Sequence, residues 1–283
     1  MLNAREQAIL DKVHDYHYDM LCKFDDVCRK HNIKYYLYYG SLIGMARHKD
    51  FIPWDDDIDI VITRKNLKKL VKYQDELSPF FVHTPSADEG FFFDFTSRMI
   101  NPMVKLKKDD DETEYYNGMN CQNLFIDLFT LDSFPGGIKG KILLFRLKIL
   151  YIFAMSRRYS KDYEAPKSII ARAGISLLRS IGKIVPLSVV FKRYNKLAKS
   201  YNGKNCKFGF LSNAAIYFLD DIAQKEWFRE TDELPIRERM FPVPYAYDEI
   251  MRSIYGDYMQ FPPEEDRKPV HIKNFNDIDF GIK

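Results

Sequence analysis

The sequence predicts an α+β fold whose helix-and-strand core is joined to a basic helical segment. Apolar residues recur at three- and four-residue steps near the N-terminus, which is typical of an amphipathic helix. Short apolar runs bounded by Gly, Pro and charged residues follow, and these indicate strands. A Pro-Gly-Gly turn at residues 135–137 then precedes a stretch rich in helix formers. With 283 residues, 46% of them apolar, the chain can bury one sizeable core and a second subdomain.

The elements of the core are expected in a definite order. A helix covers residues 3–31, and a strand (YYLYYG) follows and ends at Gly40. A second strand (IDIVIT) covers residues 58–63, and a helix covers residues 66–76. The last predicted strand, FIDLFTLD, alternates as in a strand whose polar residues share one face. This strand covers residues 125–132, and three further strands are expected before it, at residues 80–84, 91–95 and 103–106.

The segment after the Pro-Gly-Gly turn differs sharply in charge from the rest of the chain. Residues 139–199 carry fifteen Lys or Arg and two acidic residues, a net charge of +13, whereas the whole chain has +3. We therefore expect a catalytic core at 1–137, a basic amphipathic helical insertion at 138–205, and a C-terminal segment at 206–283 that packs back on the core. The apolar run at 142–155 is too short to span a bilayer. It fits either a solvated helix or a helix at an anionic membrane surface.

Composition also limits the class of protein. The net charge of +3 is too small to indicate a nucleic-acid partner. The four cysteines lack C-x-x-C spacing, so we expect reduced thiols in a cytosolic compartment. The N-terminal residues lack the apolar region of a secretory signal, which also favours a cytoplasmic location. The histidines show no metal-site spacing and are each expected at the surface or in the core: His14, His17, His31, His83 and His271.

The segment from residue 38 to residue 62, YYGSLIGMARHKDFIPWDDDIDIVI, carries the clearest chemical signal. Gly40 and Ser41 follow a strand, where backbone N–H groups can cradle a phosphate and Ser41 can cap the next helix. Asp57 and Asp59 are one residue apart in an apolar strand, so both carboxylates should share one face. Because two close carboxylates repel each other, we expect a hard divalent cation, Mg²⁺ or Mn²⁺, between them.

A second strand supplies the third expected metal ligand. Asp127 lies between apolar neighbours, and beside Asp57 and Asp59 it would complete a site in which one carboxylate accepts a proton from an attacking hydroxyl. Asp132 is the competing candidate, but its place before Ser-Phe-Pro favours a turn or a cap. We therefore assign Asp57, Asp59 and Asp127 as both metal-binding and catalytic residues.

The motif GSLIGMARHKDFIPWDDDIDI resembles the signature of the LicD-type phosphocholine transferase family, which includes fukutin-type relatives. The resemblance extends through FIDLFTLDSFP and FPVPYAYDEIMRSIYGDYMQFPPEEDR. It implies a nucleotidyltransferase-like fold with a mixed β-sheet and flanking helices. It also implies transfer of a phospho-alcohol such as phosphocholine from a CDP-linked donor, CDP-choline, to a hydroxyl of a cell-surface glycan or teichoic acid precursor.

The resemblance also suggests how the donor is bound. The family roles fall on Gly40 and Ser41, and nearby Arg47, His48 and Lys49 could meet the donor diphosphate. Trp54, with Tyr38 or Tyr39, could hold a choline head group through cation–π contact. The acceptor is expected to be lipid-linked, which would place the protein at the inner face of the cell membrane.

Other readings of the same core stay open. Ethanolamine, glycerol or ribitol phosphate could be transferred in place of phosphocholine. A nucleotidyltransferase acting on a small molecule could use the same three carboxylates, although it would give no reason for the basic insertion. A non-catalytic glycan- or membrane-binding scaffold is the third alternative, and the presence of all three carboxylates argues against it.

Overall fold

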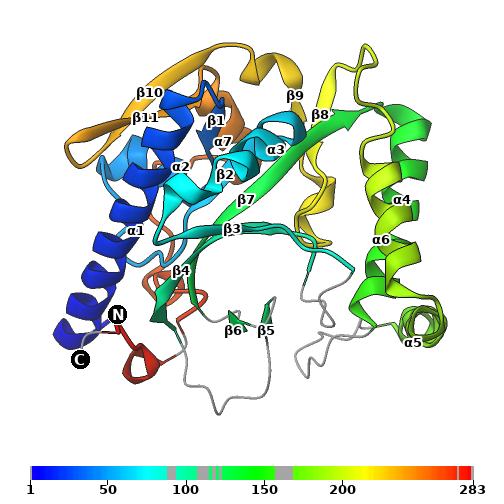
Figure 1. The fold of residues 1–283 in the computed structure, drawn as a ribbon, viewed down its shortest axis with the longest axis horizontal. Helices are drawn as coiled ribbons and strands as arrows, with labels where there is room; N and C mark the ends of the chain where they lie inside the picture. Colours follow the sequence, from blue (N-terminus) through cyan, green and yellow to red (C-terminus); the bar gives the residue numbers. More distant parts are fainter. Residues whose placement is uncertain are drawn as a thin grey trace.

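The computed structural model describes residues 2–87, 94–106, 115–116, 119–120, 123–156, 168–272 and 274–281. It confirms an α+β fold built on a mixed sheet with the strand order β1-β2-β7-β4-β3, which β8 and β9 extend from β7 (Figure 1). In this sheet β2 and β7 are parallel, and the other pairs are antiparallel. The strands are β1 (Tyr35–Leu37), β2 (Asp59–Thr63), β3 (Phe81–His83), β4 (Ser97–Lys105), β7 (Asn123–Phe134), β8 (Phe208–Leu211) and β9 (Ile222–Gln224). Two small hairpins pair β5 (Tyr115–Tyr116) with β6 (Met119–Asn120) and β10 (Thr231–Ile236) with β11 (Arg239–Pro244).

Several predicted boundaries are wrong by a few residues. The first strand stops at Leu37, because the backbone turns at Tyr39 (φ 44°), where α2 (Tyr39–Ile43) begins. A π-helical turn, η1 (Gly44–His48), continues α2. Helix α3 (Arg64–Lys72) directly follows β2 and is capped by the hydroxyl of Thr63. Of the strand expected at 91–95, residues 91–93 lie outside the described part, and the next two precede β4.

Helix α1 (Ala4–Lys30) is confirmed and packs along the sheet. A capping box fixes its start, because Asn3 accepts from the backbone N–H of Glu6 and Glu6 bonds back to Asn3. Its inner face is apolar at helical spacing and joins the main hydrophobic core. His17 Nε2 lies 3.1 Å from the backbone carbonyl oxygen of Phe125, which ties this helix to the start of β7.

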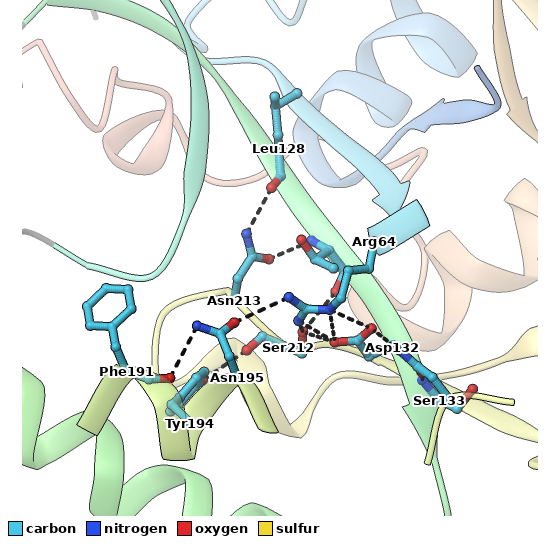
Figure 2. A network of polar contacts seen from close by, with 11 residues as sticks. Arg64, Leu128, Asp132, Ser133, Phe191, Tyr194, Asn195, Ser212 and Asn213 are labelled. Carbon is cyan, nitrogen blue, oxygen red and sulfur yellow. Dashed lines mark hydrogen bonds and ion pairs between the residues drawn. The ribbon is translucent and has the colours of Figure 1, made fainter. Parts of the chain in front are cut away.

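The C-terminal half of β7 carries a polar network around Asp132 (Figure 2). Because side chains alternate along a strand, Asp132 lies on the face opposite Asp127. Asp132 forms an ion pair with Arg64 at 2.5 Å and accepts a hydrogen bond from Ser212 at 2.6 Å. Asn213 bonds the N–H of Thr130 and the carbonyl of Leu128, in the gap between β4 and β8. The expectation that Asp132 lies in a turn or cap is wrong, because it is a buried strand residue. Its charge is compensated by Arg64, so it serves the structure of the sheet.

Three helices follow β7 and lie at the end of the molecule opposite α1 (Figure 1). These are α4 (Gly137–Met155), α5 (Ile169–Ile184) and α6 (Leu187–Ala198). A second core forms where α4 and α6 pack on Phe134 and Phe210 of the sheet. Residues 157–167 of the predicted basic segment lie outside the described part. After this segment the chain returns to the same sheet as β8. A last helix, α7 (Tyr247–Tyr255), ends at Gly256, whose φ is 68°.

The described part of the chain contains no single helix that is long and apolar enough to cross a bilayer. Helices α5 and α6 reach that length and composition only as a pair, and they are bent by 113° relative to each other.

Candidate active site

The carboxylates of Asp59 and Asp127 lie side by side because their strands are parallel neighbours. Asp59 is the first residue of β2 and is in register with Asp127 of β7, so both side chains project from the same face. Asp57 comes two residues before Asp59, just outside the strand. Both Asp59 and Asp127 are buried, whereas the Asp57 side chain is 21% exposed. The expected pairing of the D-x-D segment with a third Asp on an adjacent strand is therefore present.

The Gly-Ser turn is hydrogen-bonded to the D-x-D segment. Ser41 accepts a hydrogen bond from the N–H of Asp59 at 2.9 Å, and the N–H of Tyr38 donates to the carbonyl of Asp59. A Cβ at Gly40 would overlap the carboxylate of Asp55, so a larger residue there would displace that side chain. Ser41 does not cap a helix as expected, because α2 begins two residues before it. The turn therefore positions the start of β2 through a side-chain hydrogen bond.

Burial and mutual repulsion raise the pKa values of several carboxyl groups in this cluster, which holds more acidic than basic side chains. Burial raises the pKa of Asp59 well above its usual range, and the charges of Asp57 and Asp127 add to the effect. Burial raises the pKa of Asp55 in the same way, with Asp57 as the next cause. Burial also raises the pKa of Asp127 to about 6, although Arg98 opposes the shift. Such raised pKa values mark a site where a bound cation would be strongly favoured.

Histidine 271, at the far end of the chain, belongs to this cluster and was missed from the sequence. Its Nε2 lies 3.1 Å from Oδ2 of Asp57. Burial opposes a charge on the imidazole, but the hydrogen bond and charge of Asp57 raise the pKa of His271 to about 9. Burial would likewise raise the pKa of Asp57, but His271 outweighs it and the pKa is lowered. The expectation that His271 is an ordinary surface or core residue is wrong.

Asp56 holds this distant segment in place. Its buried carboxylate accepts the backbone N–H groups of Val270, His271 and Ile272 at 3.0, 2.8 and 2.5 Å. Three backbone donors on one carboxylate fix the segment firmly, because each is a charge-assisted hydrogen bond. No sequence signal could have identified this contact, since the partners are 214 to 216 residues apart.

Arg98 and Asp94 were also missed, and they position Asp127. Arg98 forms two hydrogen bonds with Asp94, at 2.9 and 2.8 Å, and its Nε lies 2.8 Å from Oδ1 of Asp127. The guanidinium is also 4.9 Å from the ring centre of Phe125. Arg98 is in register with Asp127 on β4, so the pairing of the strands places the cation beside the carboxylate.

The residues predicted to bind the donor diphosphate form a separate cluster with the C-terminal segment. Arg47 donates from Nη1 to the carbonyls of Tyr258 and Gln260, at 2.9 and 3.1 Å. Its guanidinium lies 4.6 Å from the ring centre of Phe261 and 5.8 Å from that of Trp54. The rings of His48 and Trp54 meet edge to face, and Lys49 is exposed. The phosphate contact predicted for these cations stays a prediction.

The aromatic residues beside the carboxylates differ from those expected. Tyr38 and Tyr39 are buried in the core, so neither offers a free ring face to a choline head group. Tyr255, in the last turn of α7, is 45% exposed. Burial of its hydroxyl raises the pKa of Tyr255, and the charge of Asp59 contributes next. Part of the Tyr255 ring therefore faces solvent, on a helix that packs against α2.

Comparison with known proteins identifies a family domain in the segment that carries most of these residues. Residues 32–132 match the family model described as "LicD/FKTN/FKRP, nucleotidyltransferase domain". This segment contains the Gly-Ser turn, the D-x-D segment and Asp127. The chain carries a LicD-family nucleotidyltransferase domain. The resemblance inferred from the motifs is thereby confirmed.

The similarity extends beyond the LicD domain. The chain is 27% identical over 267 residues to the "Lipopolysaccharide cholinephosphotransferase LicD" of Haemophilus influenzae, covering 90% of this chain and 93% of that protein. Uncharacterized proteins of Rickettsia prowazekii and Rickettsia typhi are each 39% identical over 49 residues, 17% of this chain and 18% and 16% of theirs. The chain is therefore homologous to a transferase along most of its length. Tyr255 and His271 lie outside the matched residues, and His271 contacts Asp57 within them.

The donor atoms of the LicD domain fit a hard divalent cation. All three predicted ligands are carboxylates, and Mg²⁺ prefers oxygen. Oδ1 of Asp127 is buried and has no hydrogen-bond partner among the residues that the structure describes, although it forms an ion pair with Nε of Arg98, so this oxygen retains capacity to accept. Within the described ranges, no three Asp, Glu, His or Cys side chains already surround one point as metal ligands. The metal site at Asp57, Asp59 and Asp127 stays a prediction, and Oδ2 of Asp57 is the oxygen that pairs with His271.

Proposed function

We propose that this protein transfers phosphocholine from CDP-choline to a hydroxyl of a cell-surface glycan precursor. Two observations together support this proposal. The buried carboxylates of Asp59 and Asp127 lie side by side in a LicD domain, and 90% of the chain is similar to a lipopolysaccharide cholinephosphotransferase. The acceptor class follows from that relative's name, so a lipopolysaccharide sugar is the first candidate. A teichoic acid precursor presents the same kind of hydroxyl.

The proposed reaction forms one phosphorus–oxygen bond and breaks another. The acceptor hydroxyl bonds to the phosphorus that carries choline, and cytidine monophosphate leaves with the electrons of the broken bond. The hydroxyl proton passes to one of the three carboxylates. When bound by Asp57, Asp59 and Asp127, Mg²⁺ or Mn²⁺ would neutralise the charge that develops on the phosphate oxygens. Arg98 keeps Asp127 oriented, and Ser41 keeps Asp59 at the start of its strand.

The head group of the donor can be placed by the aromatic and acidic side chains at the opening. Tyr255 exposes part of its ring beside the carboxylates, and Asp221 is held nearby through a 2.6 Å hydrogen bond from the hydroxyl of Tyr39. A trimethylammonium group is favoured by an aromatic face and by negative charge. This placement favours choline over the uncharged glycerol and ribitol.

The acceptor is proposed to be lipid-linked, with the protein at the inner face of the cell membrane. The basic helical segment supports this proposal, because its net charge of +13 suits an anionic membrane surface, whereas a small soluble acceptor would not need it. This location would bring the site to the surface where a lipid-linked glycan lies.

A panel of CDP-linked alcohols tests the chemistry. Purified protein is incubated with Mg²⁺, a glycan acceptor and CDP-linked choline, ethanolamine, glycerol or ribitol, and released cytidine monophosphate is measured. We expect release with CDP-choline and none from the Asp59→Asn variant, which keeps the shape of the site but removes a charge. Equal release by wild type and Asp59→Asn would show that this site does not carry the reaction.

A further inference from the structure

We propose that the outward face of α4 is a docking surface for an anionic lipid bilayer. The proposal rests on the proposed function in one respect, because a lipid-linked acceptor is the reason for binding a membrane. It adds which side chains enter the lipid. Three exposed apolar side chains of α4, Ile138, Ile142 and Phe145, define what we call the outer face. The fold keeps this face at the end of the molecule that lies opposite α1 (Figure 1).

Helix α4 is apolar on two opposite sides, although the protein covers only one of them. Its inner side is buried in the second core against the sheet and α6. The outer face repeats at four- and three-residue steps, so its side chains lie in one row along the helix. Ile138, Ile142 and Phe145 are 70%, 52% and 66% exposed. A contiguous exposed apolar row of this kind marks an interaction surface.

Helix α5 adds apolar surface of the same kind next to α4. It packs on α4 around Gly182, where a Cβ would overlap the backbone of Phe153. On its other sides it leaves Ile170 85% exposed and Ile184 83% exposed. These residues recur with Leu177 at helical spacing, so they form a second row. The two helices together present apolar surface without an obvious protein neighbour within the described residues.

The distribution of charge selects a lipid surface over a protein partner. At 3.6 residues per turn, Lys139 and Arg146 lie along one edge of the outer face, and Lys141 and Lys148 lie along the other. Helix α4 contains no acidic residue. Lys148 also contacts Asp220, which leaves Lys139, Lys141 and Arg146 as the exposed cations that flank the row. Long basic side chains on both edges of an apolar row match the boundary between acyl chains and anionic headgroups.

Vesicle sedimentation tests the docking directly. The full chain is mixed with vesicles of phosphatidylcholine alone or with phosphatidylserine added, at about 0.1 M and about 1 M salt, because the Debye length shrinks from about 10 Å to about 3 Å. Binding is expected to the anionic vesicles at low salt and to fall strongly at high salt. Wild type that stays in the supernatant with anionic vesicles at low salt overturns the proposal.

Matched variants separate this surface from charge in general. The triple change of Lys139, Lys141 and Arg146 to Gln should weaken partitioning by about 100-fold, since each cation near an anionic surface contributes roughly fivefold. The same number of charges is removed in the control from exposed positions on α1 and α3: Arg5→Gln, Lys65→Gln and Lys72→Gln. The control should bind at least tenfold better than the α4 variant. Equal loss in both overturns the assignment to α4.

A second pair of variants tests the apolar row. Changing Ile138, Ile142 and Phe145 to Ser should abolish binding, whereas the same change at the exposed Met103, Tyr217 and Met240 should not. Circular dichroism confirms that each variant is folded. Light scattering tests whether a second copy of the chain binds this face instead. The lipid proposal is overturned if the wild type forms a dimer that the α4 variant does not form and the wild type does not bind vesicles. Cytidine monophosphate release is measured without vesicles, so failure of docking is distinguished from failure of the chemistry.

Discussion

Neutralising Asp127 should stabilise the protein when no metal is present. Asp127→Asn keeps the shape of the side chain and, like protonated Asp, carries no charge. The pKa of Asp127 is raised from 3.8 to about 6 in the folded protein, chiefly by burial. The folded state therefore holds this proton more tightly than the unfolded state, and ionisation costs stability as pH rises. About two pKa units correspond to about 3 kcal/mol.

The size of the stability difference changes with pH in a defined window. Below about pH 4 the carboxyl is protonated in both states, so wild type and Asp127→Asn should be about equally stable. As pH rises through about 6 the wild type loses about 3 kcal/mol that the variant retains. The difference should be complete at pH 8. It would appear as an increase of about 6 °C in the midpoint of thermal unfolding of the variant.

Urea unfolding in EDTA at several pH values from 4.5 to 8 measures this difference. Mg²⁺ at about a thousand times the dissociation constant should then reverse the order, because binding to the folded wild type contributes about 4.1 kcal/mol, more than the difference of about 3 kcal/mol. The matched control is Asp132→Asn, whose carboxylate pairs with Arg64 on the opposite face and should not gain stability. Wild type more stable than Asp127→Asn at pH 8 in EDTA would refute the argument that the cluster lacks positive charge.

Three further outcomes follow from the same contacts. Asp57→Asn should lower the pKa of His271 from about 9 toward its ordinary value, as followed by NMR titration of the ring protons, and an unchanged pKa would contradict the pairing. Asp132→Ala should destabilise the protein by about 3–5 kcal/mol in urea unfolding, because Arg64 loses its partner, and a loss below about 1 kcal/mol would contradict that role. Tyr255→Leu should raise KM for CDP-choline more than for the glycerol analogue, whereas Tyr255→Phe should retain the preference. Equal effects on both donors would exclude a head-group contact.

Local patterns predicted the elements that carry the site. The alternation of Asp and apolar residues around Asp59 and Asp127 predicted two strands with their carboxylates on buried surfaces. Both strands are present. Spacing of apolar residues likewise predicted α1 and the basic helices. Boundaries were less predictable, since the turn at Tyr39 depends on a positive φ that the aromatic run does not announce.

Contacts between distant segments could not be predicted from pattern. Asp56 reaches the backbone of residues 270–272, and that contact brings His271 to Asp57. Arg98 reaches Asp127 only because β4 pairs with β7 in one register. Neither partner stands in a local motif, since a lone His or Arg has many possible uses. The resemblance to LicD proteins located the carboxylates but not the cations that hold them.

Transfer of radioactive label from CDP-choline tests the central claim most directly. Two donors are prepared, one labelled at the phosphorus that carries choline and one at the phosphorus that carries cytidine, and each is incubated with wild-type protein, Mg²⁺ and a lipopolysaccharide acceptor. The account predicts that only the choline-side label enters the glycan, and that Asp59→Asn transfers neither. Entry of the cytidine-side label would instead show nucleotidyl transfer and contradict the proposed reaction.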